Sequence, residues 1–159
     1  MKKYPILITS LLVLSACAQK PPKAEKAIID LPYQSLVPTG FLIIEPESQR
    51  FVDLNLVQKQ KDSPHLVHFD VVTNLTQGIY AYPEAENDHA KSSRKKHSLN
   101  CQSQEVVQLN EVYYSDFWGK GKASPTNTMY KKVVKSYPET PLHLLGKLMC
   151  AELYVDKNQ

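Results

Sequence analysis

The chain has 159 residues, which is enough for one compact domain with a tail and not for two domains. Its formal net charge is +3, and Lys2 and Lys3 at the N-terminus supply two of these charges. The overall charge therefore points to no particular class of partner. The sequence contains neither internal repeats nor low-complexity tracts.

The first residues have the layout of a secretory signal. Residues 1–4 form a short positive start, and residues 5–14 are almost entirely apolar. An apolar stretch of about 10 residues is too short to cross roughly 30 Å of hydrocarbon. We therefore expect a cleaved signal peptide and not a membrane-spanning helix.

The signal ends in Leu14, Ser15, Ala16 and Cys17, which matches the lipobox of bacterial lipoproteins. We expect cleavage after Ala16 and lipid on Cys17, although an unmodified cysteine in a signal peptide is the alternative. Cleavage would remove 16 residues and two lysines, leaving 143 residues with a formal charge of +1. Ala18 stands where an aspartate would retain the protein in the inner membrane. We therefore expect attachment to the outer membrane.

Two further cysteines, Cys101 and Cys150, form an even pair in a chain exported to an oxidising compartment. This arrangement favours one disulfide. Two buried free thiols or a pair of metal ligands are the alternatives, but neither cysteine has another close enough in sequence for zinc-type spacing.

Residues 17–39 are predicted to be a tether carrying the lipid. Prolines and charged residues dominate this stretch and apolar residues are few, so it can bury little surface. The folded domain is then expected over residues 40–159.

Short or alternating apolar runs predict β-strands along most of this domain. A turn at residues 46–48 and a turn at Gln77 and Gly78 are each expected to close a hairpin. Residues 84–94 lack apolar periodicity and are expected to form a loop, and residues 119–127 a long turn. The predicted strands cover residues 41–44, 50–57, 65–75, 79–82, 95–101, 105–114 and 129–134.

The period changes to that of a helix near the end of the chain. Thr140 can cap a helix with Pro141 in its first position. The apolar stripe that follows consists of Leu142, Leu145, Met149 and Leu153. The predicted fold is thus α+β, an antiparallel β-sheet meander with one C-terminal α-helix packed on it.

Several segments in this order resemble the surface-adhesin protein E family of Gram-negative lipoproteins. They are LVHFDVVTNL (residues 66–75), GIYAYPE (78–84), LNC (99–101), DFWGKG (116–121) and CA (150–151). The resemblance implies an antiparallel sheet with a C-terminal helix, a disulfide between Cys101 and Cys150, and a lipid-anchored outer-membrane protein. It also implies an adhesin that binds host vitronectin, laminin and plasminogen, and it says nothing of catalysis. From the residues themselves we expect no enzymatic activity and no cofactor.

The candidate ligand-binding residues lie in a basic cluster that the resemblance also singles out. In the family, basic residues begin just after the Tyr-Pro-Glu turn, whereas here residues 85–88 read Ala-Glu-Asn-Asp. Basic charge follows later, and we expect it on an open, solvated loop. Its charges either serve only as solvated gatekeepers or contact acidic or sulfated host surfaces. The residues are Lys91, Arg94, Lys95, Lys96 and His97.

Other chemistry is less well supported by the sequence. His65, His68 and Asp70 suggest a metal site, but a strand places His65 on the opposite face from the other two, so a histidine paired with a carboxylate is the better interpretation. No nucleophile elbow or oxyanion motif accompanies the serines near residue 95. Nucleic acid is not expected as a partner outside the cytoplasm.

The sequence leaves two functional hypotheses. The first is a surface adhesin for host matrix or serum proteins, and the second is a periplasm-facing lipoprotein that maintains the envelope and binds no host ligand. The oligomeric state, a homodimer included, stays open.

Overall fold

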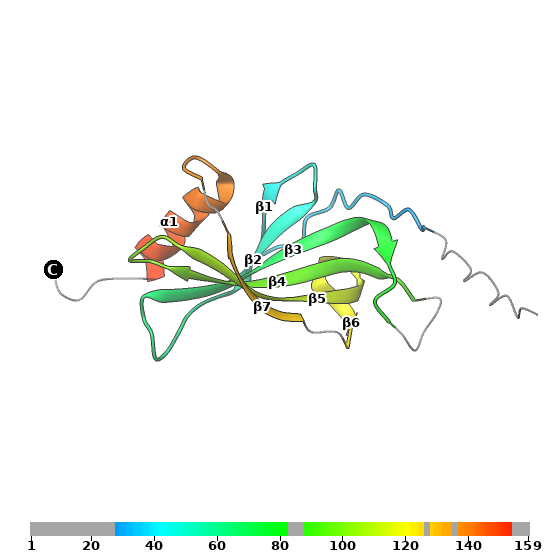
Figure 1. Ribbon diagram of the computed structural model, residues 1–159. Helices are drawn as coiled ribbons and strands as arrows, with labels where there is room; N and C mark the ends of the chain where they lie inside the picture. The colour runs from blue at the N-terminus through cyan, green and yellow to red at the C-terminus, as the bar shows by residue number, and fades with distance from the viewer. Residues whose placement is uncertain (1–27, 83–87, 126–127, 135–136, 154–159) are drawn as a thin grey trace, which may run out of the picture.

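The computed structural model describes residues 28–82, 88–125, 128–134 and 137–153. Within these ranges the chain forms one antiparallel sheet of seven strands, a short 3₁₀ helix and one α-helix (Figure 1). The strands are β1 (Phe41–Glu45), β2 (Arg50–Lys59), β3 (Leu66–Ile79), β4 (Ala90–Asn100), β5 (Val106–Asp116), β6 (Lys120–Ala123) and β7 (Thr128–Val134).

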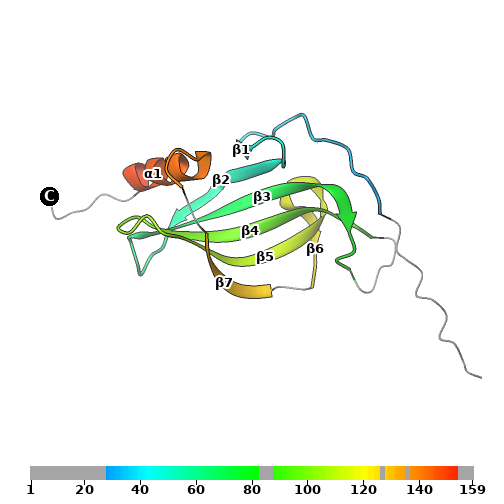
Figure 2. The ribbon, with the colours of Figure 1, turned by 45° about the horizontal axis from the view of Figure 1, so that its top comes forward.

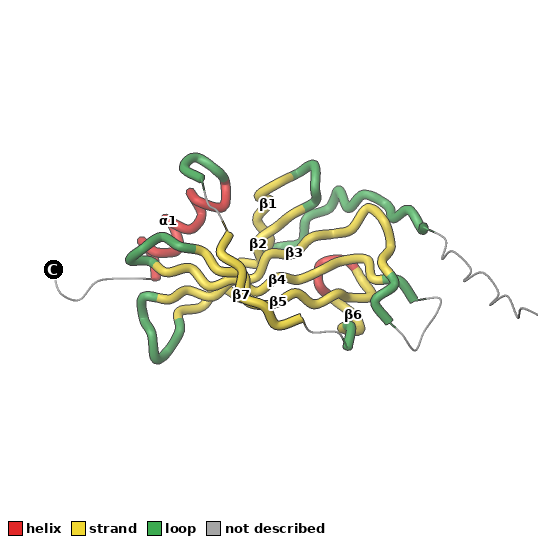
Figure 3. The backbone as a smooth tube through the Cα atoms, viewed as in Figure 1, coloured by secondary structure: helices red, strands yellow, loops and turns green. Residues whose placement is uncertain are grey.

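The strands follow one another across the sheet in the order β1-β2-β3-β4-β5-β6, and β7 also pairs with β5. This is the predicted meander. Long central strands with short edge strands give the sheet an elongated, twisted shape (Figure 3). β6 and β7 pair with different halves of β5, since Asp116 lies opposite Lys120 and Val106 lies opposite Val134.

One face of the sheet carries the main hydrophobic core. The alternation predicted for β3 places Val67, Phe69 and Val71 on this face, and each is at most 1% exposed. Val67 pairs with Leu99 on β4, so the two central strands contribute to the same apolar layer.

The helix α1 (Pro141–Leu153) covers this face at one end of the sheet (Figure 2). Its start is as predicted, because the His143 backbone N–H donates to Thr140 Oγ1 at 3.3 Å. Leu145 and Met149 are buried in the core, with Leu142 and Leu153 packed against it. The disulfide joins Cys150 on α1 to Cys101 at the end of β4, with the two Cα atoms 5.5 Å apart.

The opposite face has a smaller core around the 3₁₀ helix Phe117–Gly119 (η1). The Trp118 ring lies 4.6 Å from the ring of Phe51 and 5.2 Å from that of Phe41, measured between centroids. The Trp118 backbone N–H donates to the buried Oδ1 of Asn74 at 2.8 Å. Trp118 thus closes one end of the fold.

Three local predictions were wrong. β3 continues through Gln77 and Gly78 to Ile79, so there is no hairpin at these residues. β4 begins at Ala90, inside the predicted loop of residues 84–94; residues 84–87 lie outside the described ranges. The predicted long turn at residues 119–127 contains β6. In each case hydrogen bonding to a neighbouring strand outweighs the weak local signal.

Part of the predicted tether is attached to the sheet. Asp30 forms an isolated antiparallel bridge with Gln77, and the backbone N–H groups of Leu31 and Gly78 donate to Thr76 O and Ile29 O, both at 2.8 Å. Residues 29–31 therefore extend the sheet next to the end of β3. Cys17 and the predicted signal peptide lie outside the described residues.

Candidate binding surface

The five predicted basic residues lie on β4, which pairs with β3 on one side and β5 on the other. They are therefore held in the middle of a sheet and not on an open loop. Alternation along the strand sends Arg94 and Lys96 to the face of Trp118, and Lys95 and His97 to the face of α1. The expectation of a solvated, self-repelling loop is wrong.

Arg94 forms the central ion pairs of a buried cluster. Its Nη1 lies 2.9 Å from Asp53 Oδ2 and 3.2 Å from Asp70 Oδ2, and its Nη2 donates to the Trp118 carbonyl oxygen at 3.4 Å. The three charged side chains are 15%, 7% and 14% exposed, in that order. Gly119 leaves room for the guanidinium, because a Cβ there would lie 2.7 Å from Arg94 Nε.

The charge balance in this cluster is uneven, with two carboxylates and one guanidinium. Burial raises the pKa of Asp70, and the negative charge of Asp53 acts in the same direction. The hydrogen bond and the charge of Arg94 lower that pKa, as does the charge of Lys96. Arg94 is thus the cation that keeps two neighbouring buried carboxylates in the fold, and is not available to a partner.

His97 is also part of the interior. It is 2% exposed, and its ring stacks on Phe69 with the centroids 5.2 Å apart. Burial is the main cause that lowers the pKa of His97 from 6.5 to about 4. The hydrogen bond that His97 makes to the Lys95 backbone raises this pKa, and the positive charges of Arg50 and Lys95 lower it. His97 is therefore neutral at physiological pH, with Nδ1–H donating to Lys95 O at 2.9 Å.

The three lysines of the predicted cluster reach solvent to different extents. Lys91 Nζ lies 3.6 Å from Asp116 Oδ1, and Lys95 Nζ lies 3.4 Å from Glu111 Oε1. Lys96, on the other face of β4, forms no salt bridge with any carboxylate in the described part of the chain.

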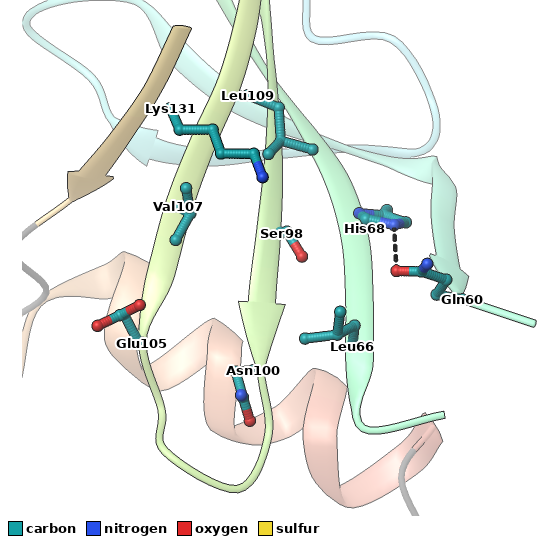
Figure 4. Close-up of a pocket in the computed structure, with 9 residues that line it drawn as sticks. All are labelled: Gln60, Leu66, His68, Ser98, Asn100, Glu105, Val107, Leu109 and Lys131. Carbon is teal, nitrogen blue, oxygen red and sulfur yellow. Dashed lines mark hydrogen bonds between the residues drawn. The ribbon is translucent and has the colours of Figure 1, made fainter. Parts of the chain in front are cut away.

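A groove of about 450 Å³ lies on the sheet face opposite α1 (Figure 4). Leu66, Val107 and Leu109 supply apolar surface, and the Lys131 ammonium lies beside Leu109. A second hollow of about 300 Å³ shares His68 with this groove and is lined by Lys96 and Asp70. The remaining groove residues are Gln60, His68, Ser98, Asn100 and Glu105.

The histidine of this groove has a different partner from the one expected. His68 Nε2 lies 3.1 Å from Gln60 Oε1, whereas the neighbouring Asp70 binds Arg94. The interpretation of His68 as paired with a carboxylate was therefore wrong. No group of three or more histidine, cysteine or acidic side chains in the described ranges could hold a metal ion.

The partners of Arg94 were not predicted from the sequence, and neither was the groove lysine Lys131. Asp53 and Asp70 lie directly opposite each other on β2 and β3. Like charges in that position are destabilising unless a cation lies between them. The signal was two aspartates in otherwise apolar strands, but it can be interpreted only when the strand register is known.

Comparison with known proteins assigns this chain to a family. A family profile described as surface-adhesin protein E matches residues 42–151. The chain belongs to the surface-adhesin protein E family.

The relatives are similar over almost their whole length. Surface-adhesin protein E from each of two strains of Haemophilus influenzae is 32% identical over 151 residues, which covers 95% of this chain and 93% of the relative. A solved structure of Haemophilus influenzae protein E has a TM-score of 0.70 at 28% identity, covering 79% of this chain and 95% of that one. A crystal structure of protein E from the non-typeable form has a TM-score of 0.71, covering 80% and 86%. No helix in the described part of this family member is long and apolar enough to span a membrane.

The buried cluster gives a first prediction. Arg94→Gln is expected to lower the free energy of unfolding by about 3–5 kcal/mol at pH 7, because two buried carboxylates lose their cation. The matched control is Lys95→Gln on the same strand, where a partly exposed ion pair contributes about 1 kcal/mol or less. Urea unfolding followed by Trp118 fluorescence measures both. Equal stability of the two variants would contradict the assignment of Arg94 to the interior.

His97 gives a prediction on pH. Above pH 6.5 it is neutral in both the folded and the unfolded chain, and as the pH falls from 6.5 to about 4 only the unfolded chain takes up the proton. The wild type should therefore lose about 3 kcal/mol of stability over this interval through His97, a loss that the non-titrating variant His97→Gln avoids.

The measurement is the difference in free energy of unfolding between wild type and His97→Gln at a series of pH values. Asp70 acts in the opposite sense, because its raised pKa adds stability below 3.8 that is lost as the pH rises. That contribution is present in both proteins and cancels in the difference. A difference that stays constant from pH 7 to pH 4 would show that His97 is not held neutral.

Proposed function

We propose that this protein is a lipid-anchored adhesin of the outer membrane that binds host extracellular-matrix or serum proteins and has no catalytic activity. The observation that carries the proposal is its membership of the surface-adhesin protein E family, with similarity over almost the whole chain. Vitronectin, laminin and plasminogen are the ligand class that the family resemblance suggests.

The contact surface that we propose is the sheet face opposite α1. Two lysines on this face, Lys96 and Lys131, form no ion pair with a carboxylate of the described residues. Each lines one of the two adjoining hollows, which share His68. Positive charge beside partly apolar, hydrogen-bonding surface suits a protein ligand with acidic groups, or a sulfated chain.

The originally predicted cluster contributes to this surface mainly through Lys96. Arg94 and His97 support the proposal only indirectly, because they hold β4 in place from the interior. Lys95 faces the other side and pairs with Glu111, and Lys91 pairs with the exposed Asp116. Each of these two lysines could bind an acidic group of a partner only by giving up the carboxylate with which it already pairs.

A binding experiment tests the surface. The double variant Lys96→Gln and Lys131→Gln should reduce binding to immobilised vitronectin, laminin or heparin by roughly tenfold, because the half-buried Lys96 and the exposed Lys131 both lose their positive charge on this face. The difference in binding between the wild type and the double variant should shrink as salt rises, since screening acts over about 8 Å at physiological ionic strength. Surface plasmon resonance at two salt concentrations measures it.

Lys95→Gln is the control, because it removes one positive charge from the other face of β4. Equal loss by Lys95→Gln and the double variant would move the contact away from this face. Absence of binding by the wild type to all three ligands would favour the periplasm-facing, envelope-maintenance role.

The lipid anchor has its own test. Cys17→Ser should release the protein from the membrane fraction without detergent, because each acyl methylene contributes about 0.8 kcal/mol to anchoring. In parallel, protease shaving of intact cells should degrade the wild-type protein. Retention of Cys17→Ser in the membrane would reject the anchor, and protection of the wild type would place the protein inside the envelope.

A further inference from the structure

The N-terminal part of the described chain carries an unusual amount of exposed apolar surface. Among the described residues fourteen large hydrophobic side chains are exposed, and six of these lie together in sequence or in strand pairing. Leu36 is 86% exposed, Ile28 73% and Tyr33 59%. We call the six residues the N-terminal apolar patch; they are Ile28, Ile29, Tyr33, Leu36, Val37 and Ile79.

This patch is fixed to the folded domain. Backbone hydrogen bonds join residues 29–31 to the end of β3, and this antiparallel register places Ile79 opposite Ile28. The Gln34 backbone N–H donates at 3.0 Å to Oε1 of Gln49, whose side chain is fully buried. Asp30, the acidic residue of this segment, interacts with Gln77 at 3.4 Å. The apolar side chains are thus presented to solvent in a set orientation.

The position of the patch limits what can cover it. Residues 28–37 run from the end of the sheet opposite α1 along its edge toward β1 (Figures 1 and 2). The chain leads from there back to Cys17, eleven residues before Ile28. Eleven residues span at most about 40 Å when fully extended, so a lipid on Cys17 keeps the patch close to a bilayer.

The intervening sequence adds positive charge. Residues 18–27 contain Lys20, Lys23 and Lys26 against the single carboxylate of Glu25. Lysines near an anionic membrane contribute about 1 kcal/mol each to attraction. Branched aliphatic side chains with a tyrosine, next to a group of lysines, have the composition of a surface that sits at a lipid–water boundary.

We propose that the N-terminal apolar patch rests in the headgroup region of an anionic phospholipid bilayer and orients the domain with α1 pointing away from it. The inference rests on the proposed lipid anchor, which supplies the proximity. The patch supplies the orientation, because residues 29–31 and Gln34 hold its segment to the folded domain.

Fluorescence quenching tests the orientation in the mature lipidated protein. The variants Leu36→Trp and Leu148→Trp are each reconstituted in vesicles of phosphatidylethanolamine and phosphatidylglycerol with brominated acyl chains. Leu148 on α1 is 62% exposed, and native Trp118, which is 8% exposed, gives the unquenched baseline. The Leu36→Trp signal should fall by about half through contact with the acyl region, and the Leu148→Trp signal should be unchanged. Equal quenching of both variants, or quenching of neither, would overturn the proposal.

A second measurement separates the patch from the anchor. Without the lipid, the mature chain (Cys17→Ser) should bind the same vesicles, unbrominated, only weakly and reversibly, so that it co-sediments at low salt and high lipid concentration although it washes out of a membrane fraction. Adding Ile28→Ser, Tyr33→Ser and Leu36→Ser should weaken this binding by about tenfold or more. Leu144→Ser with Leu148→Ser is the control at the α1 end and should bind as before. No co-sedimentation of the parent chain, or self-association that the patch variant abolishes, would overturn the lipid assignment. Neither measurement depends on host-ligand binding. The adhesin proposal and the membrane-contact proposal can therefore be rejected independently of each other.

Discussion

The ion pairs of Arg94 are the interaction on which the sheet depends. One guanidinium binds carboxylates from β2 and β3 and the carbonyl oxygen of Trp118, so a single side chain of β4 joins three strands to η1. Buried carboxylates directly opposite each other tolerate no other register, since a shift by one residue would send them to the apolar face of α1. The polar cluster thus fixes the alignment that the apolar residues alone would leave less defined.

The two faces of the sheet are completed in different ways, and this determines where a partner can bind. α1 and the disulfide close one face at the end where β4 meets Cys101. η1 closes the other face only at the opposite end, around Trp118 and Phe51. The uncovered remainder of that second face is where the groove lies, with polar side chains pointing outward (Figure 4).

Much of the fold could be predicted from the sequence. Alternation in β3, the Thr140 cap with its apolar stripe, and the cysteine pair each depend on local pattern or simple counting, and each was confirmed. The start of β4 could not be predicted, because its charges are matched across strands: Arg94 by Asp53 and Asp70, Lys95 by Glu111. A strand whose charged side chains are matched by neighbouring strands shows no alternation of apolar residues in its sequence. The basic residues from Lys91 to His97 were therefore expected on a loop. Predicting which lysines face a partner required the same register.

The membrane-facing and ligand-facing proposals are compatible because they use opposite ends of the same strand. β3 begins at Leu66, in the groove, and passes the bridge to Asp30 at Gln77, eleven residues later. At about 3.3 Å per residue the strand separates these two points by roughly 35 Å. A domain resting on the N-terminal apolar patch would therefore hold the groove and Lys131 away from the bilayer. Residues 17–159 carry a formal net charge of only +1, so neither contact can arise from net charge. The membrane contact and the ligand contact each depend on side chains whose orientation is set by the sheet. The Arg94 cluster, which lies between the two surfaces, fixes the strand register on which both orientations depend.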